Sequence, residues 1–578
     1  MMFAARNRAL FLTVMVVCLS LMSSAVPARA QVAADTYAYD LAFDQDGFTT
    51  VRILFTSAFV GSGTSWVAVP KNFTDTSVQP LRGSIVSMMR EPYRLGEGGQ
   101  PHQFYDNLTF SYTSVNEPFS MRLRYNMTYG AMIVEPNGFF YSPQIGVPLS
   151  ATVRATLTFP DGVESLDQVQ PAPAQMGTCL SKTELIFNLP SQSRIAVTFR
   201  VSWARQTSHI RDGGVDADVP SRYLDLGNRM VELYKKAVPL MNKLFNETVN
   251  RISMRFFTPS TLPELGIGGY TPVDPSSFQT GSIYLNLFYF RALPGTMETI
   301  AIHELTHQYE ARAGISPELL WVHEGLANYV AVQMGQPLSY DIASTDADLR
   351  SAASELNGNY GAIQYWQPGG TVESLFQYYA ASYEVFKTLG DEYGGLSLYS
   401  KFFAQLHDLK EGLRSTNVAV YELGLAAQTN LSPQFTKWGF ELVDLASLSD
   451  RIAKLSKEAQ LYGPLLPFRE QALGHLQQAQ NSLFSSPEVA TGHTTIAAFY
   501  IETVPIIIGG VVIVVILLVL VVVVISKRSK RKHAENSGHA RFLQLGRNLD
   551  EHRERSEGLL TEPSSVWNWW LSPVCEPP

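Results

Sequence analysis

Residues 303 to 307 read His-Glu-Leu-Thr-His, and Glu324 follows within the stretch Trp321-Val-His-Glu-Gly-Leu-Ala-Asn-Tyr-Val330. Residues four apart on an α-helix lie on the same face one turn apart, so His303 and His307 can present imidazole nitrogens to one metal ion. The preceding Leu293-Pro-Gly-Thr-Met-Glu298 favours a helix start just before the motif. The pattern therefore predicts a helix that carries a pair of metal ligands.

A catalytic site on this helix needs a base and a third ligand. Catalytic zinc sites keep three protein ligands and leave the fourth position open. Glu304 lies beside the first histidine, where its carboxylate can accept a proton from water that the metal polarises. Glu324, on a second predicted helix, is the candidate third ligand. A His-Glu-x-x-His string alone also arises by chance on solvated helix faces, so the flanking helix signals matter. We predict one Zn²⁺ per chain, with His303, His307 and Glu324 as ligands.

The two motifs resemble those of the gluzincin zinc metallopeptidases, most closely the peptidase MA-like family and more distantly the aminopeptidase N-like enzymes. The resemblance is carried by His303-Glu-Leu-Thr-His307 and Trp321-x-x-Glu-Gly-Leu-Ala-x-Tyr329, and it covers about residues 260 to 400. It implies a thermolysin-like catalytic domain in which Glu304 acts as general base and acid.

Two further segments fit the mechanics of that family. Gly281–Leu287 alternates apolar and polar residues, which favours a strand, and gluzincins place an edge strand above the metal helix. The segment Tyr378–Tyr383 resembles the family's helix that supplies a tyrosine hydroxyl to the tetrahedral intermediate. The resemblance implies Tyr379 in this role, with Tyr383 as second choice. The alternative, that both tyrosines are aromatic core or surface residues, stays open.

Departures from the better-known relatives limit the expected activity. Aminopeptidase N-like enzymes carry a Gly-x-Met-Glu-Asn segment whose glutamate holds the substrate's free amine, but the comparable stretch here reads Gly266-Ile-Gly-Gly-Tyr-Thr-Pro-Val-Asp274. Aminopeptidase activity is therefore not assigned. Asn328, one turn after Glu324, can accept a hydrogen bond from a ligand histidine or be a solvated helix residue. His323 is interpreted as a rim or packing residue.

The chain ends predict where the site operates. Arg6 and Arg8 precede an apolar run, and Ala28-Arg-Ala30 offers a cleavage site, so residues 1–30 read as a secretory signal peptide. Residues 504–525 contain no charge and are long enough to cross a bilayer. Positive residues follow at once, at Lys527, Arg528, Lys530, Arg531 and Lys532. Because positive residues stay on the cytoplasmic side, we expect a single-pass cell-membrane protein with its N-terminal ectodomain outside.

Cysteine content and charge exclude some classes of protein. Cys18 leaves with the predicted signal and Cys575 lies in the predicted tail, so Cys179 alone remains outside and no intramolecular disulfide is expected there. The net charge is −8, and no extended basic stripe occurs outside the juxtamembrane tail. Nucleic-acid binding therefore has no support.

We predict a multidomain chain. Short runs of β-forming residues broken by Gly, Pro and Asn favour an N-terminal all-β sandwich, and helical periodicity follows with a strand at Ile252–Phe257 that opens a mixed α/β to α-rich catalytic lobe. The expected divisions are signal peptide 1–30, β-sandwich 31–205, metallopeptidase domain 206–445, helical membrane-proximal region 446–503, transmembrane helix 504–525 and cytoplasmic tail 526–578. Trp567, Trp569 and Trp570 in the tail suit a cytoplasmic partner, the inner membrane face or an incidental cluster.

The sequence as a whole predicts a membrane-anchored extracellular zinc metallopeptidase that acts on peptide or protein substrates. Two alternatives remain open. One is a cell-surface receptor or adhesion module on an inactive peptidase-like fold, and the other is a zinc hydrolase of a non-peptide substrate. Glu304 argues against the first, because a purely structural metal site does not need that carboxylate.

Overall fold

The computed structural model describes residues 34–539, except for 72–75, 95–100, 180–181, 205, 369–373, 410–411 and 464–466. The predicted signal peptide and the Trp567–Trp570 cluster therefore lie outside the described residues. The chain divides into two compact units, Met1–Arg451 with Gln480–Thr491 and Ile452–Ala479 with Gly492–Pro578. Each is described by itself.

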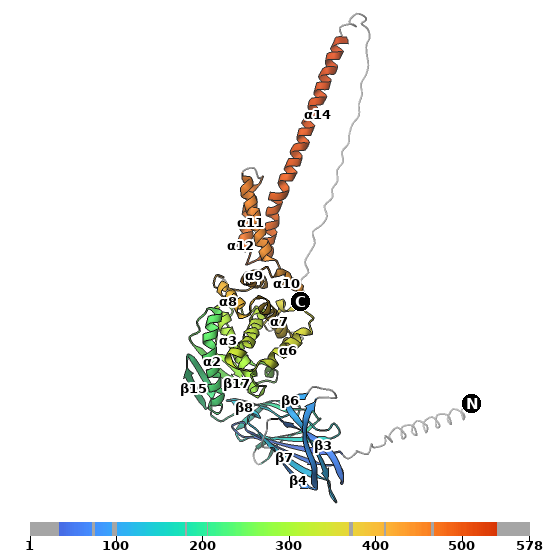
Figure 1. Ribbon diagram of the computed structural model, residues 1–578, viewed down its shortest axis with the longest axis vertical. Coiled ribbons are helices and arrows are strands. Elements are labelled where there is room, and N and C mark those ends of the chain that lie inside the picture. The colour runs from blue at the N-terminus through green and yellow to red at the C-terminus, as the bar shows by residue number, and fades with distance from the viewer. Residues whose placement is uncertain are drawn as a thin grey trace, which may run out of the picture. The chain divides into compact units, whose positions relative to one another are not determined.

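The first unit begins with a region of β-strands, drawn in blue to cyan in Figure 1. The strands are β1 (Thr36–Phe43), β2 (Thr49–Thr56), β3 (Ser62–Pro70), β4 (Ser77–Arg82), β5 (Ser84–Arg94), β6 (Pro101–Thr113), β7 (Ser120–Met127), β8 (Ala131–Val134), β9 (Asn137–Tyr141), β10 (Thr152–Thr158), β11 (Val163–Gln170), β12 (Gln175–Cys179), β13 (Lys182–Leu189) and β14 (Ala196–Val201). They form sheets of order β12-β13-β10-β1-β2-β7-β4, β11-β14-β9-β8 and β3-β6-β5. Leu41, Phe110 and Phe199, one from each sheet, belong to one buried core, so the sheets pack as layers.

A mixed α/β region follows in the same unit. Its elements are β15 (Thr207–Asp212), β16 (Val215–Pro220), η1 (Ser221–Tyr223), α2 (Leu224–Phe245), β17 (Ile252–Phe257), η2 (Pro263–Gly266), β18 (Gly269–Tyr270), β19 (Ile283–Asn286) and η3 (Leu287–Arg291). The sheet order is β15-β16-β17-β19-β18. The sequence predicted that this sheet opens at Ile252, but it opens two strands earlier. Val215, Ala217 and Val219 alternate inward in β16, which pairs in parallel with β17.

Helices complete the first unit. They are α3 (Thr296–Arg312), α4 (Leu320–Gln333), α5 (Gly335–Leu338), α6 (Ala343–Ser354), η4 (Gly361–Tyr365), α7 (Leu375–Tyr393), α8 (Leu396–Leu406), α9 (Thr416–Ala427) and α10 (Ser432–Lys437). Helix α3 packs against α2 and α4 and against β18 and β19, and most of its side chains are buried. A helix enclosed on several sides has no single apolar stripe. The predicted motif therefore lies inside the protein.

The close approach of α4 to α7 depends on a glycine. A Cβ atom on Gly325 would lie 2.7 Å from the backbone oxygen of Ser382, nearer than such atoms approach in proteins. The backbones of the two helices can therefore approach this closely only because Gly325 has no side chain. This contact fixes the turn of α4 that carries the neighbouring Glu324.

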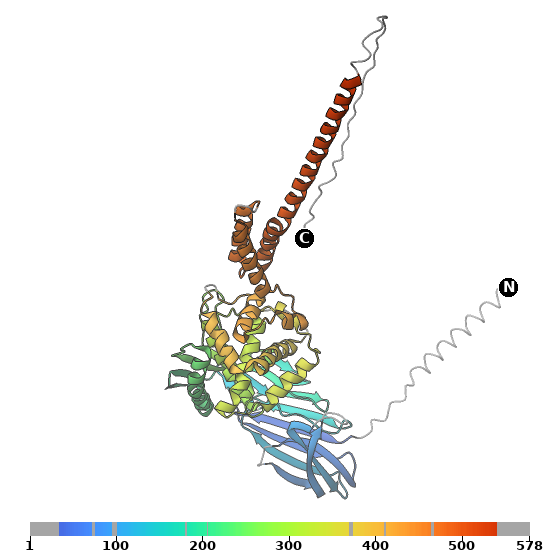
Figure 2. The same ribbon diagram turned by 45° about the horizontal axis from the view of Figure 1, so that its top comes forward.

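The second unit is helical. It contains all or most of α11 (Leu445–Tyr462), α12 (Arg469–Ser482), α13 (Pro487–Ala498), the π-helical turn η6 (Phe499–Thr503) and α14 (Val504–His539). The ends of the first three helices belong to the first unit. Helices α13 and α14 run on through η6, and the continuous helix Pro487–Lys530 is long and apolar enough to cross a membrane by length and composition. The orange and red helices of Figure 2 show this arrangement. The predicted order of β-rich, mixed α/β, helical and long apolar segments is confirmed.

Candidate metal centre

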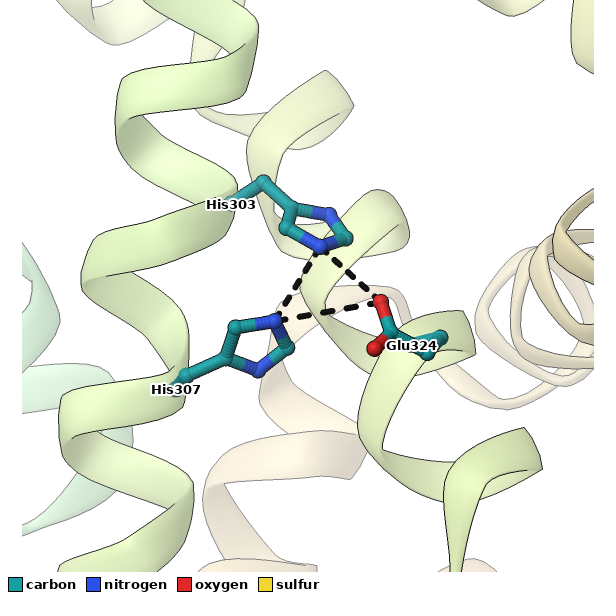
Figure 3. A group of neighbouring side chains, drawn as sticks. All are labelled: His303, His307 and Glu324. Atoms are coloured by element: carbon teal, nitrogen blue, oxygen red, sulfur yellow. Dashed lines mark hydrogen bonds and ion pairs between the residues drawn. The ribbon is translucent and has the colours of Figure 1, made fainter. Parts of the chain in front are cut away.

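Three predicted ligands converge between helices α3 and α4. The Nε2 atom of His303 lies 3.0 Å from Oε2 of Glu324 and 3.1 Å from Nε2 of His307. The third distance, from Nε2 of His307 to the same carboxylate oxygen, is 3.8 Å. Figure 3 shows the two imidazoles and the carboxylate pointing toward one another from the two helices. The fold thus brings together three side chains that the sequence separates by a helix end and a turn.

This donor set fits a zinc ion. Ligand atoms about 2.0–2.2 Å from zinc in tetrahedral geometry lie roughly 3.3 Å apart, which is close to the three distances here. The charges fit as well. Burial lowers the pKa of His307, but Glu310, Glu324 and Glu304 more than offset it and raise that pKa to about 9. A negative potential that favours a proton on this imidazole also favours a divalent cation beside it.

Glu324 remains ionised in this environment. Burial alone would raise its pKa, but the hydrogen bond from His303 and the neighbouring histidines lower it to about 2. A carboxylate with so low a pKa is available as an anionic ligand across the physiological pH range.

Glu304 lies beside the three ligand atoms but is held by a different contact. Its side chain is buried, and the hydroxyl of Thr271 lies 3.0 Å from its Oε2 atom. Burial raises the pKa of Glu304, and the nearby histidines oppose that rise. A carboxylate with a raised pKa is a stronger proton acceptor than a free one, which suits a general base.

Each candidate ligand histidine has an outer partner. The Nδ1 atom of His303 lies 3.0 Å from Oδ1 of Asn328, the residue that the sequence offered for this role. The Nδ1 atom of His307 lies 2.7 Å from Oε2 of Glu310. Acceptors at Nδ1 hold the proton on that nitrogen and leave the Nε2 lone pair for a metal. Both rings are thus oriented by their neighbours.

Glu310 was missed by the sequence analysis, and His323 was only partly understood. Glu310 is fully buried, and the Nδ1 atom of His323 lies 2.9 Å from its Oε2 atom. The rings of His307 and His323 stack with centroids 4.6 Å apart. His323 is therefore a packing residue, as expected, but it also shares the carboxylate that orients a ligand. The sequence did contain a signal for Glu310, because it lies three residues, or about one helical turn, after His307 on the same helix.

The two candidate tyrosines on α7 differ in their surroundings. The pKa of Tyr379 is raised by the negative charge of Glu324, by burial and by the negative charge of Glu304, so this tyrosine lies within the electrostatic field of the two carboxylates. The ring of Tyr379 packs edge-on against Trp366. In contrast, the hydroxyl of Tyr383 donates a hydrogen bond 2.5 Å long to Asp346 on α6. The hydroxyl of Tyr383 is therefore already bonded to a residue outside the candidate metal centre.

The edge strand of the mixed α/β sheet is not the one expected. Gly281–Leu287 does contain a strand, β19, but the two-residue strand β18 pairs antiparallel with it and forms the edge of the sheet. A Cβ atom on Gly269 would lie 2.8 Å from Cγ of Glu304. The edge strand approaches the metal helix this closely because position 269 is glycine. Asp274 ends the stretch Gly266–Asp274 that contains β18. Its carboxylate accepts hydrogen bonds from the backbone N–H groups of Ser276 and Ser277 within its own loop.

Comparison with known proteins does not assign this chain to a family. No family model matches the chain, and no curated protein matches it. Among solved structures it is similar to an aminopeptidase N family protein from Idiomarina loihiensis, at 12% identity and a TM-score of 0.31, over 70% of this chain and 75% of that one. The interpretation of the centre therefore rests on its own geometry.

Proposed function

We propose that this chain is a membrane-anchored zinc metallopeptidase of the gluzincin type. The observation that carries the proposal is the convergence of the Nε2 atoms of His303 and His307 with Oε2 of Glu324, all pairs within 3.8 Å. Glu304, the one further acidic residue of the motif, is buried next to these atoms with a raised pKa. Three ligands with an adjacent base suit hydrolysis, whereas a structural zinc site has four protein ligands.

Each residue of the centre would have a separate role in the reaction. Zinc held by His303, His307 and Glu324 would supply Lewis acidity toward the scissile carbonyl and the attacking water. Glu304 would take a proton from that water and return it to the departing amine. The Tyr379 hydroxyl would donate a hydrogen bond to the oxyanion that develops on the carbonyl. Asn328 and Glu310 would hold the ligand imidazoles in one tautomer.

Helix α14 would anchor the chain in a membrane. Its span is uncharged from residue 504 to residue 525, and five basic residues lie between Lys527 and Lys532. Basic residues remain on the cytoplasmic side, so residues before the span would be outside the cell. The metal centre would then act on extracellular peptides or proteins.

The test uses the full-length chain in detergent and its Glu304→Gln variant, with Glu318→Gln as the control because Glu318 is an exposed glutamate ahead of α4. Bound zinc is measured by elemental analysis. Cleavage is measured by mass spectrometry on a peptide mixture with free and blocked amino termini. We expect stoichiometric zinc in all three proteins and cleavage by all except Glu304→Gln. Removal of a general base lowers turnover by about 10²- to 10⁴-fold.

Other outcomes have distinct meanings. Zinc without cleavage by the wild-type chain favours a receptor or a hydrolase of non-peptide substrates. A folded chain without zinc refutes the assignment of the three ligands. Cleavage only of peptides with a free amino terminus indicates an aminopeptidase, and cleavage at internal bonds of blocked peptides indicates an endopeptidase.

A further inference from the structure

Helices α11 and α12 form a hairpin within the second unit, and the described residues at its tip are apolar. Leu461 and Tyr462 end α11, and Phe468 precedes α12. Their exposed fractions are 83%, 51% and 54%. The hairpin also has a buried side, formed by Ile452, Leu455, Ala472 and Leu476. The exposed apolar tip is therefore distinct from the face that packs the hairpin together.

Ring contacts align the hairpin with the helix that leads into α14. His475 of α12 lies with its Nδ1 atom 2.9 Å from Nδ1 of His493 on α13. Tyr500, in η6, stacks on His475 at 6.1 Å between ring centroids and also contacts the ring of Phe468 at 5.9 Å. Helix α12 thus runs antiparallel to α13, and the tip of the hairpin is directed the same way as α14. The hairpin beside the base of the long helix is visible in both Figure 1 and Figure 2.

These contacts give the position of the hairpin tip along the axis of α14, relative to the start of the uncharged span. Tyr500 precedes Val504, the first residue of the uncharged span, by four residues, which is about 6 Å along a helix. The ring of Phe468 contacts Tyr500. The Nε atom of Arg469 lies 3.4 Å from the backbone oxygen of Ala459, so the end of α11, with Leu461 and Tyr462, lies at a similar level to the start of α12. The exposed tip therefore lies within about one helical turn of the start of the membrane span.

The polarity of both elements changes at the same level. Helix α11 is charged as far as Lys457 and Glu458 and becomes apolar at Leu461. On the other element, Glu502 is the last charged residue before the exposed apolar side chains that begin near Ile506. Tyrosine and other aromatic residues are typical of the layer where hydrocarbon meets headgroups. Tyr462, Phe468, Phe499 and Tyr500 lie in this layer if α14 crosses the membrane.

We propose that Leu461, Tyr462 and Phe468 insert into the outer leaflet of the membrane that α14 crosses, as a second point of attachment. The occupant is lipid because the exposed apolar surface of the tip lies within about one helical turn of the surface that α14 presents to lipid. This inference rests on the membrane anchoring in the proposed function and does not depend on peptidase activity. Two attachment points prevent the hairpin from tilting freely relative to the membrane plane.

The test places a fluorophore at single cysteines of the full-length chain in phosphatidylcholine vesicles. Cys18, Cys179 and Cys575 are first replaced by serine. An environment-sensitive NBD label is then attached to Leu461→Cys, to Lys454→Cys as a control about two turns away on the same helix, and to Ile507→Cys as a control inside the span. Quenching is measured with nitroxide lipids labelled near the top of the acyl chain and with iodide in the water. All three positions are exposed, so the labels disturb no core.

We expect nitroxide quenching at 461 to approach that at 507, and we expect iodide to quench only 454. Nitroxide quenching at 461 no greater than at 454, with 507 quenched, overturns the inference and leaves the anchor intact. A label at 461 that is shielded from both quenchers also overturns it, because protein rather than lipid then covers the tip. A lack of nitroxide quenching at 507 refutes the membrane anchor itself.

Discussion

Replacing Glu310 with glutamine should weaken zinc binding while leaving the chain folded. The buried Glu310 carboxylate lies 2.7 Å from Nδ1 of His307 and 2.9 Å from Nδ1 of His323. Both rings contact the same oxygen, Oε2, so a glutamine oxygen in that place can still accept from both, but it carries no negative charge. The His307 imidazole therefore loses its charge-assisted hydrogen bond, which makes its Nε2 atom a weaker ligand. Loss of such an outer partner lowers metal affinity by about 10- to 100-fold, which corresponds to about 1.4 to 2.7 kcal/mol.

The assay is competition for zinc against a chromophoric chelator at constant pH, with the thermal midpoint of the metal-free chain as a check on folding. Glu318→Gln is the matched control, because Glu318 is exposed and should bind zinc as the wild type does. An affinity of Glu310→Gln within a factor of about two of wild type would refute the reasoning, because that change is far below the expected loss of an outer partner. Glu310 would then be a structural residue without influence on the ligand imidazole.

Three other substitutions are informative. Tyr379→Phe should lower kcat by about 10²- to 10³-fold with little change in KM, because an oxyanion donor is lost; Tyr383→Phe should not. Gly269→Ala should lower activity by about 10²-fold, because the new methyl group displaces Glu304, and misplacement of a catalytic group by about 1 Å has that effect. Gly266→Ala is its control, because a Cβ atom at Gly266 would meet nothing within 4 Å. Glu422→Gln should stabilise the chain at pH 8 by at most about 3 kcal/mol, because burial and Asp408 raise the pKa of Glu422 to about 7.

Each of these has a control and a contradicting result. Equal kcat losses in the two tyrosine variants would remove Tyr379 from the reaction. Gly266→Ala controls for the loss of a glycine, so a similar defect there would contradict the steric argument. The wild type should lose stability relative to Glu422→Gln as pH rises from about 4.5 to about 7, since only its folded state resists ionisation. Thermal midpoints that differ equally at pH 4 and pH 8 would contradict this.

The local part of the centre was predictable from sequence because helical spacing alone determines it. His303 and His307 share a helix face by their separation of four, and the glycine and proline signals around them give the helix ends. The edge strand was not predictable in the same way. Gly269 and Tyr270 are too few residues to show a period of two, and β18 exists because it pairs with β19 at a distance in sequence. The sequence therefore assigned the edge to the wrong strand.

Tyr379 and Tyr383 show a similar limit at the level of side chains. They lie four apart on α7, so the pattern places both on one face and cannot separate them. The difference comes from α6, which brings Asp346 to Tyr383, and from Glu324 on α4, whose charge acts on Tyr379. Neither neighbour is local to the tyrosines, and both depend on packing between helices.

The charges of the centre argue that function rather than stability selected these residues. Glu304 and Glu310 are buried on a helix that is enclosed by its neighbours, and Glu324 faces them from α4. Buried carboxylates destabilise a fold unless they are paired, and replacement by apolar residues of similar size is often neutral or stabilising. Here three histidines provide the pairing, and each has a ring nitrogen within 3.0 Å of a carboxylate oxygen. His303 contacts Glu324, and His307 and His323 share Glu310. Packing explains why such a helix is apolar elsewhere, and a bound cation would explain why its polar residues converge on one point.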